Sequence, residues 1–402
     1  MVVIAQKNSP VPMTDPQRDV VVVGAGPVGL SVALGLAKAD RSVLVLEKEP
    51  GTSDHSRAPI IWPRTQEIFA DLGVLDPFLD AGIVRSEVQL WDADRDEALL
   101  RVPIHELRGE TLCPHLLLCP QSTTEEILCD AVRATSSAEV CFSAKVTALS
   151  PEAGGVEVQY DRNGTSRSTT AAFVAGCDGA HSRVREAVAA SFEGMTYGMQ
   201  AGLADLTFAD DPDVQSPRMT RRRGVVTGIR IDEQRWRVIM PQAPGDTTPL
   251  DPRIEQAVEN LFGTDAYTTV WKSEFNLHRR LADPFVHGRL ALAGDAAHLT
   301  SPMGGQGMNV GIQDANALRR ALDEALDRGR ATPLARYEAE RREALEGGAV
   351  WATDTLTRGL LAREGAFLVP ALRLMNLLLR IGPLRRLMLW RMALLDDPSR
   401  RM

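Results

Sequence analysis

Three short turns hold the residues of this chain that are best suited to chemistry. The first is the glycine-rich run at 24–29, with the sequence GAGPVG. The second is the CDG sequence at 177–179, and the third is the GD pair at 294–295, which a second glycine-rich run follows at 302–309. Each turn comes after a short apolar run that is typical of a buried parallel strand. The first turn, which precedes a helix N-terminus, can bind a phosphate group, and the chemistry that we expect needs neither a metal site nor a side-chain nucleophile.

The first turn has the spacing of a dinucleotide-binding β-α-β unit. Gly24 permits a tight turn, Gly26 lets the backbone approach a pyrophosphate, and Gly29 lets the following helix pack closely on the strand. Pro27 belongs to the same loop, and the helix N-terminus favours the charge of the phosphate. Because strands and helix stand on both sides of the loop, a glycine turn without a ligand is the weaker interpretation.

An acidic residue completes this unit. Glu47 follows the second strand at 42–46, where its carboxylate can accept hydrogen bonds from an adenosine ribose and its charge would repel a 2′-phosphate. Lys48 comes next. Asp40 stands where such units commonly end the helix with glycine, and we expect little effect, because Asp tolerates the left-handed conformation better than most residues.

In this order, the three motifs resemble those of the single-component FAD-dependent aromatic hydroxylases, the family of para-hydroxybenzoate hydroxylase and the polyketide hydroxylases. The resemblance covers residues 19–185 and 280–320. It implies that Asp178 and Arg183 handle FAD and NAD(P)H, and that Asp295 binds a hydroxyl of the flavin ribityl chain. The loop at 302–309 would lie beneath the isoalloxazine ring, with Arg57 near the cofactor and Gln121 along it. The expected cofactor-binding residues are Gly24, Gly26, Pro27, Gly29, Glu47, Lys48, Arg57, Gln121, Asp178, Arg183, Gly294, Asp295, Gly307, Met308 and Asn309. The expected catalytic contribution is the loop backbone of Pro302, Gly304 and Gly305.

The residues themselves allow other roles at some of these positions. Gly304, Gly305 and Gly307 would leave N–H groups uncovered at a helix N-terminus, which stabilises negative charge on a reduced flavin. Asp178 and Asp295 could instead cap helices, since Asp is a preferred N-cap residue. For the neighbouring histidines, at 181 and 298, we favour structural roles over acid–base roles.

The resemblance implies a monooxygenase that takes electrons from NADH or NADPH and hydroxylates an aromatic or polycyclic small molecule through a flavin C4a-hydroperoxide. Baeyer–Villiger oxygen insertion and a non-catalytic flavin-binding role stay open. A flavin-dependent halogenase is disfavoured, because its W-x-W-x-I-P signature is absent and the nearest segment, 235–241, has one tryptophan. The substrate and the choice of nicotinamide stay open as well.

The fold class that we expect is α/β. A discontinuous Rossmann-like FAD-binding domain would comprise 19–90, 112–190 and 280–350. Short alternating runs separated by Pro, Gly and Asp predict an antiparallel-sheet substrate domain at 191–279, to which 91–111, beginning with Trp91, adds a strand. Helices would fill 351–402. Many polyketide hydroxylases carry a further thioredoxin-like domain, for which we expect no room here.

The composition limits the kinds of partner that the protein is expected to bind. The formal charge is −8, from 53 acidic and 45 basic residues, so nucleic-acid binding is not expected. Five cysteines without C-x-x-C spacing and a first segment without signal-peptide features indicate a cytoplasmic protein, as a monomer or homodimer. No window is apolar enough to span a membrane. The stretch at 367–395 is rich in Leu and Met with arginines between them, so it could lie on a membrane surface. We favour a packed helical cap instead, because two prolines interrupt the stretch.

Overall fold

The computed structural model describes residues 13–53, 58–222, 225–242, 245–301, 304–349 and 368–401. A nine-stranded sheet forms around the β-branched run at 20–23, whose first three valines are completely buried. Its central strands are parallel, as expected for strands covered on both faces. The strands along its main path are β10 (Ala144–Pro151), β11 (Val156–Arg162), β12 (Thr165–Gly176), β2 (Arg18–Val23), β3 (Val43–Leu46) and β9 (Ala138–Cys141), and β1 (Met13–Thr14), β18 (Val286–His287) and β19 (Leu290–Leu292) join at β12 or β19.

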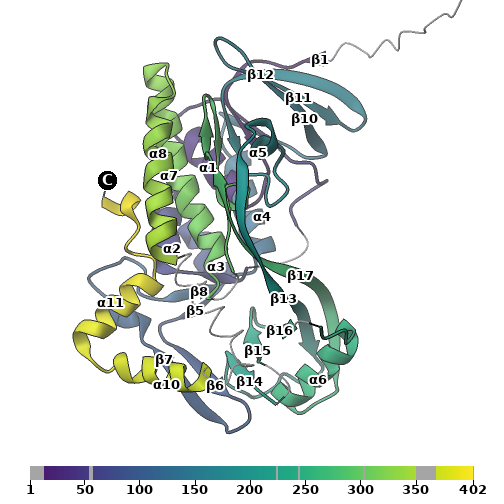
Figure 1. Ribbon diagram of the computed structural model, residues 1–402, viewed down its shortest axis with the longest axis vertical. Coiled ribbons are helices and arrows are strands. Elements are labelled where there is room, and N and C mark those ends of the chain that lie inside the picture. Colours follow the sequence, from purple (N-terminus) through teal and green to yellow (C-terminus); the bar gives the residue numbers. More distant parts are fainter. Residues whose placement is uncertain are drawn as a thin grey trace, which may run out of the picture.

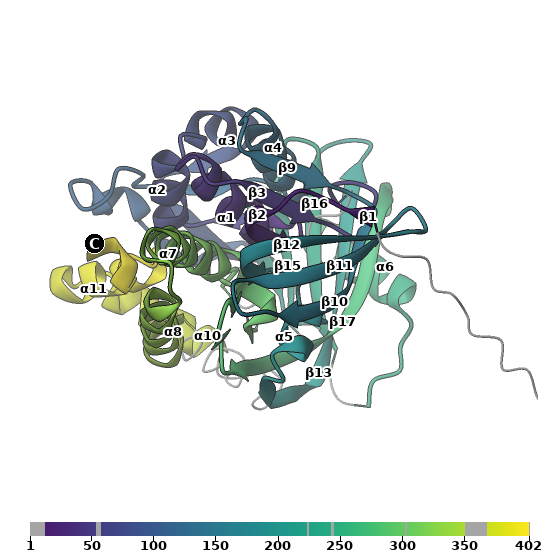
Figure 2. The ribbon, with the colours of Figure 1, turned by 90° about the horizontal axis from the view of Figure 1, so that it is seen from above.

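Helices cover this sheet. Seen from above, α1 (Pro27–Ala37) lies between the sheet and α7 (Gly307–Arg328), with α8 (Thr332–Ala344) next to α7 (Figure 2). Asp40, just beyond α1, adopts φ 58°, so it takes the left-handed conformation expected of it. The other helices around this sheet are α2 (Pro63–Asp71), α3 (Leu75–Ala81), α4 (Gln121–Arg133) and α5 (Arg183–Ala187). A small sheet of β4 (Ile60–Ile61), β8 (Leu116–Leu118) and β5 (Ile83–Arg85) lies beside them.

An eight-stranded sheet forms the second layer of the molecule. Its two longest strands, β13 (Ser191–Phe208) and β17 (Tyr267–Asp283), pair antiparallel and run from the first sheet into the second (Figure 1). Trp91 pairs with Arg218, which confirms that the segment around it adds a strand. The remaining strands are β6 (Val88–Asp92), β7 (Glu97–Val102), β14 (Arg218–Thr220), β15 (Val226–Arg230), β16 (Arg235–Gln242) and β20 (His298–Leu299).

The two faces of the second sheet differ. The helix α6 (Leu250–Phe262) packs on one face against alternate residues of β13 and β16, among them Ala204 and Val238. The adjacent residues Asp205, after Ala204, and Arg237, before Val238, therefore belong to the opposite face. The architecture confirms the α/β class with a Rossmann-like unit and a second sheet that is antiparallel except between β6 and β14, whereas the expected domain boundaries stay a prediction.

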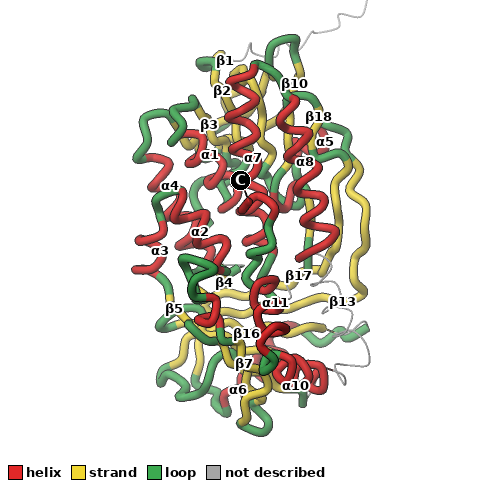
Figure 3. The backbone as a smooth tube through the Cα atoms, turned by 90° about the vertical axis from the view of Figure 1, so that its left-hand side faces the viewer, coloured by secondary structure: helices red, strands yellow, loops and turns green. Residues whose placement is uncertain are grey.

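The C-terminal helices α10 (Leu368–Leu378) and α11 (Gly382–Met392) lie at the same end of the molecule as the eight-stranded sheet (Figure 3). Leu389 and Leu395 are buried in the core that the nine-stranded sheet contributes to, which supports the packed cap. The part of the expected C-terminal helices at 351–367 lies outside the described residues. Among the helices described, none has the length and apolarity to cross a membrane.

Candidate functional site

The carboxyl ends of four parallel strands line up at one edge of the nine-stranded sheet. Val23 is in register with Leu46 and with Gly176, and Gly176 is in register with Leu292. The three turns singled out in the sequence therefore begin side by side, although up to 270 positions separate them along the chain (294 minus 24). Open parallel sheets bind their ligands in the crevice outside these strand ends.

The glycines of the first turn have separate structural reasons. A Cβ at Gly24, where φ is 104°, would lie 2.4 Å from the Cys177 carbonyl oxygen. A Cβ at Gly29 would lie 2.0 Å from the carbonyl oxygen of Gly24, so both positions require glycine for packing. Gly26 is different, because among the described residues nothing beyond its chain neighbours lies within 4 Å of a Cβ built there. The space beside Gly26 is what a bound pyrophosphate needs.

The start of α1 agrees with that fit. Gly26 is its N-cap, Pro27 occupies the first turn, and no side chain caps the N-terminus. The first-turn N–H groups of a helix lack intrahelical partners, so a phosphate can accept their hydrogen bonds. The residues present therefore fit the pyrophosphate of FAD.

Glu47 lies next to this loop, as its place after β3 requires. Its Oε2 accepts a hydrogen bond from the backbone N–H of Ala25 at 2.7 Å, and its Oε1 accepts one from Glu49 at 3.0 Å. These bonds hold the carboxylate in one orientation, and each oxygen keeps acceptor capacity for a ribose hydroxyl. The Lys48 ammonium is exposed and lies 3.8 Å from the Glu49 carboxylate.

Asp178 lies four residues before Ser182, the N-cap of α5, and accepts hydrogen bonds from the start of that helix. Its carboxylate accepts hydrogen bonds from Ser182 Oγ at 2.5 Å, from the Arg183 N–H at 2.6 Å and from the Val184 N–H at 3.3 Å, at the start of α5. Burial raises the pKa of Asp178, and these hydrogen bonds oppose that effect. The N-cap itself is Ser182, so Asp178 supports the helix start without being its cap residue, and its role toward FAD stays a prediction.

Two other expected residues also have protein partners. The exposed Arg183 guanidinium pairs with Glu186 at 2.5 Å, one turn along α5. The Gln121 amide, at the start of α4, donates to Glu125 at 2.8 Å. Arg57 and Pro302 lie outside the described residues.

The third turn presents one residue to solvent. Gly294 and Ala296 are buried, and Asp295 between them is exposed. Gly294 has φ 60°, and a Cβ there would lie 2.9 Å from a methyl group of Val28 on α1. Asp295 sits inside the short 3-10 helix η2 (Gly294–Ala296), whose N-cap is Ala293 and lacks a side-chain cap. The exposure of Asp295 is compatible with the expected contact to a flavin hydroxyl, and that role stays a prediction.

Hydrogen bonds connect the second glycine-rich run to β4 and to the residue that follows it. The buried Asn309 side chain accepts from the Trp62 N–H at 2.9 Å and donates to the carbonyls of Ile60 at 2.8 Å and Gly305 at 2.9 Å. The Trp62 indole donates to the Gly304 carbonyl at 3.2 Å. Asn309 therefore orders the loop through its side chain.

The start of α7 completes this loop. The helix begins at Gly307, its N-cap Gln306 makes no side-chain cap, and Met308 packs against the core. Gly304 and Gly305 have φ values of 80° and 62°, which glycine adopts readily. N–H groups at this helix start stay available for negative charge.

The site also contains residues that sequence reasoning missed. Asp314 is completely buried on α7, and the His298 Nε2 lies 2.5 Å from its Oδ2, so this histidine has a structural partner. Arg185 donates to the Ala296 carbonyl at 3.0 Å. The sequence does carry a signal for Asp314, which is an aspartate among the apolar residues of a helix face. Burying an unpaired carboxylate is costly, so such a residue indicates a buried polar partner.

Asp295→Ala is expected to weaken FAD binding about tenfold or more, since a charge-assisted hydrogen bond to a hydroxyl contributes about 1.5–3 kcal/mol. Thermal unfolding of the apo-protein, measured alongside, separates this loss of affinity from any effect on stability. Fluorescence titration of the apo-protein with FAD measures the effect, and Asp295→Asn, which keeps an acceptor, should lose less. An unchanged dissociation constant would remove Asp295 from the cofactor site.

Comparisons with known proteins agree with this geometry. A family model described as "FAD binding domain" matches residues 17–349. An uncharacterized aromatic compound monooxygenase, YhjG of Bacillus subtilis, is 33% identical over 82% of this chain, and the match spans 66% of that protein. The 6-hydroxy-3-succinoylpyridine 3-monooxygenase HspB of Pseudomonas putida is 33% identical over 81% of this chain and 84% of its own.

Solved structures show the same likeness. The p-nitrophenol 4-monooxygenase PnpA of Pseudomonas putida superposes with a TM-score of 0.85 at 26% identity, over 93% of this chain and 97% of that one. The anhydrotetracycline hydroxylase OxyS of Streptomyces rimosus gives 0.79 at 29% identity, over 94% and 76%. The chain belongs to the FAD-dependent monooxygenases of the aromatic hydroxylase type.

Proposed function

We propose that this protein uses NADH or NADPH and O₂ to hydroxylate an aromatic or polycyclic small molecule that already carries an electron-donating hydroxyl group. The observation that carries the proposal is the meeting of the three turns at one sheet edge, with open space at Gly26 and an exposed Asp295. The printed names of relatives support the substrate class, since they include a para-nitrophenol and a pentachlorophenol monooxygenase.

FAD supplies the activation of O₂ when it is bound and reduced. The contribution of the protein is binding and placement. The glycine loop and the start of α1 hold the pyrophosphate, Glu47 binds the adenosine ribose, and Asp295 binds the ribityl chain. Uncovered N–H groups near Gly307 favour negative charge on the flavin ring.

The substrate is proposed to lie on the side of the eight-stranded sheet opposite α6. That sheet is joined to the flavin site through β20, which follows the third turn directly and pairs with β17 at Arg280 and Leu281. On this side, Arg237 and Asp205 form a buried ion pair that stiffens the sheet, with the Arg237 guanidinium 5.9 Å from the Trp271 ring centroid. The sheet would thus hold an aromatic substrate beside the flavin and limit the access of water.

A screen of phenols and polycyclic aromatic compounds tests the proposal. A true substrate should stimulate NADH or NADPH oxidation and yield a product with one added oxygen atom, which mass spectrometry detects. Nuclear magnetic resonance then shows whether a ring carbon has gained a hydroxyl or oxygen has entered beside a ketone. If the FAD-loaded protein oxidises neither nicotinamide with any compound, the catalytic proposal is wrong and a flavin-binding role replaces it.

Arg183 is proposed to serve the nicotinamide rather than the flavin, because its guanidinium is exposed beside the second turn. Arg183→Ala is expected to slow reduction of bound FAD about tenfold, a barrier change of about 1.4 kcal/mol, since the phosphates of NAD(P)H lose a cationic partner. Stopped-flow absorbance measures the reduction. Arg183→Lys should retain much of the rate, and FAD affinity should stay unchanged; an equal loss of FAD affinity would contradict the assignment.

We also propose a cytoplasmic setting, as a monomer or homodimer. All five cysteines are free, at positions 113, 119, 129, 141 and 177. Burial raises the pKa of Cys113, Cys119 and Cys141 to about 11, so these thiols stay protonated and unreactive at neutral pH. Gel filtration distinguishes monomer from dimer.

A further inference from the structure

A buried carboxylate holds both ends of the third turn. Asp314 Oδ2 accepts a hydrogen bond from the Gly294 N–H at 3.0 Å and one from His298 Nε2 at 2.5 Å. Nε2 is the donor, because a carboxylate can only accept. Asp314 is completely buried and His298 is 2% exposed, so water does not replace these contacts.

Further hydrogen bonds restrict the backbone of the third turn. The Ala297 N–H donates to the Gly294 carbonyl at 2.8 Å, and Arg185 holds the Ala296 carbonyl. Asp295 is the residue whose side chain is exposed. Its direction therefore depends on where Asp314 places the ends of the turn.

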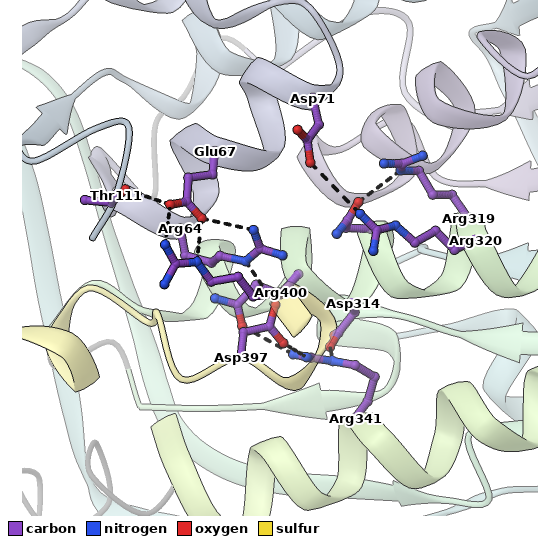
Figure 4. Close-up of polar contacts among 12 residues, drawn as sticks. Arg64, Glu67, Asp71, Thr111, Asp314, Arg319, Arg320, Arg341, Asp397 and Arg400 are labelled. Atoms are coloured by element: carbon purple, nitrogen blue, oxygen red, sulfur yellow. Dashed lines mark hydrogen bonds and ion pairs between the residues drawn. The ribbon is translucent and has the colours of Figure 1, made fainter. Parts of the chain in front are cut away.

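A line of alternating charges continues from Asp314 to the C-terminal segment (Figure 4). Arg341 on α8 donates from Nε to Asp314 Oδ1 at 2.7 Å and from Nη1 to Asp397 Oδ1 at 2.7 Å. Arg64 on α2 donates to the other oxygen of Asp397 at 3.2 Å. Arg64 also pairs with Glu67 at 3.1 Å, and Glu67 pairs with Arg400 at 3.0 Å.

The charges in this line balance. Three carboxylates alternate with three guanidinium groups, and Arg341 is only 1% exposed. Burial alone would raise the pKa of Asp314, but His298 and Arg341 outweigh it and hold the pKa below its usual value. Asp314 therefore stays an anion, and removing one member would leave a buried charge without compensation.

We propose that Asp314 is a positioning residue for the flavin: it sets the Gly294–Ala296 turn so that Asp295 meets the ribityl chain, and Asp397 supports it through Arg341. The C-terminal segment is then part of the flavin site, although it lies outside the matched range 17–349. This inference rests on the proposed role of Asp295.

The test compares two ligands of the apo-protein. ADP reaches the glycine loop and Glu47 but has no ribityl chain, whereas FAD meets the third turn as well. Asp314→Asn is expected to weaken FAD about tenfold and ADP by less than about twofold. At saturating FAD, the visible circular dichroism of the bound flavin should change, because the turn no longer fixes its orientation. Asp71→Asn, the same substitution on α2, is the control: its 54% exposed carboxylate pairs with Arg320 at 4.0 Å outside this line, and both affinities should stay unchanged.

Two further variants keep the test decisive if Asp314→Asn does not fold. His298→Asn cuts one tether and leaves the Asp314–Arg341 pair intact, and Asp397→Asn acts from the C-terminal segment. Both should show the same selective loss for FAD. Combining Asp295→Ala with Asp314→Asn should add little to either single change, since both act on one contact.

Equal weakening of FAD and ADP, or unchanged FAD affinity with an unchanged flavin spectrum, would overturn the positioning role. Full additivity in the double variant would overturn it too. These outcomes differ from failure of the proposed function, in which the wild-type protein itself takes up no FAD.

Discussion

Alanine at Gly26 is expected to weaken FAD binding about 10–100-fold while the apo-protein keeps its stability. Apart from its chain neighbours, no atom of the described residues lies within 4 Å of the added Cβ, so the fold accepts it, but the methyl group occupies the space that the pyrophosphate needs. Overpacking of this kind costs about 1–3 kcal/mol, which here falls on the bound state. Fluorescence titration with FAD and thermal unfolding of the apo-protein separate the two effects.

The neighbouring glycine provides the contrast. Gly29→Ala places its Cβ 2.0 Å from a backbone oxygen, so the apo-protein itself should lose about 3 kcal/mol or more. Gly154→Ala, at an exposed position where a Cβ also meets nothing within 4 Å, should change neither stability nor affinity. If Gly26→Ala bound FAD as tightly as Gly154→Ala, the phosphate cradle would have to lie elsewhere.

Asp205→Asn is expected to destabilise the protein by about 3–5 kcal/mol, because it leaves the Arg237 guanidinium as a buried charge without its counterion. The pair is bidentate, with Nε to Oδ1 at 2.7 Å and Nη2 to Oδ2 at 2.8 Å, and both side chains are at most 3% exposed. Denaturant unfolding of the FAD-saturated protein measures the loss.

Two controls separate burial from charge pairing. Asp251→Asn breaks the exposed ion pair with Lys272 and should change stability by less than about 1 kcal/mol. Replacing both partners, Asp205→Leu with Arg237→Met, should recover most of the loss, because no charge is then left buried. If Asp205→Asn cost no more than Asp251→Asn, the pair would not be desolvated in solution.

Much of the fold and part of the site could be predicted from the sequence. The β-α-β unit at 20–46 is local: four consecutive β-branched residues, a glycine turn and a helical periodicity determine it within one short segment. The left-handed Asp40 follows from the same local reasoning. The three turns were recognisable individually, since glycine and aspartate after an apolar run limit what the backbone can do.

The contacts of individual polar side chains could not be predicted from the sequence. Asp178 allowed two roles, and only the folded chain brings Ser182, Arg183 and Val184 around its carboxylate. Asn309 matched the expected loop, but its bonds to Ile60 and Trp62 cross about 250 positions of sequence, as the numbering shows. No periodicity specifies contacts at such a separation.

The sequence by itself determined that a phosphate-binding turn would follow a buried strand, because backbone conformation and strand burial are local properties of residues 20–29. Tertiary structure alone decided that three turns share one sheet edge, since strand pairing in β2, β12 and β19 brings them together. It also decided that Asp314 would face Arg341 and that Arg341 would face Asp397. A buried charge must find its counterion wherever the packed helices place one, and that partner depends on the whole fold rather than on the neighbouring residues.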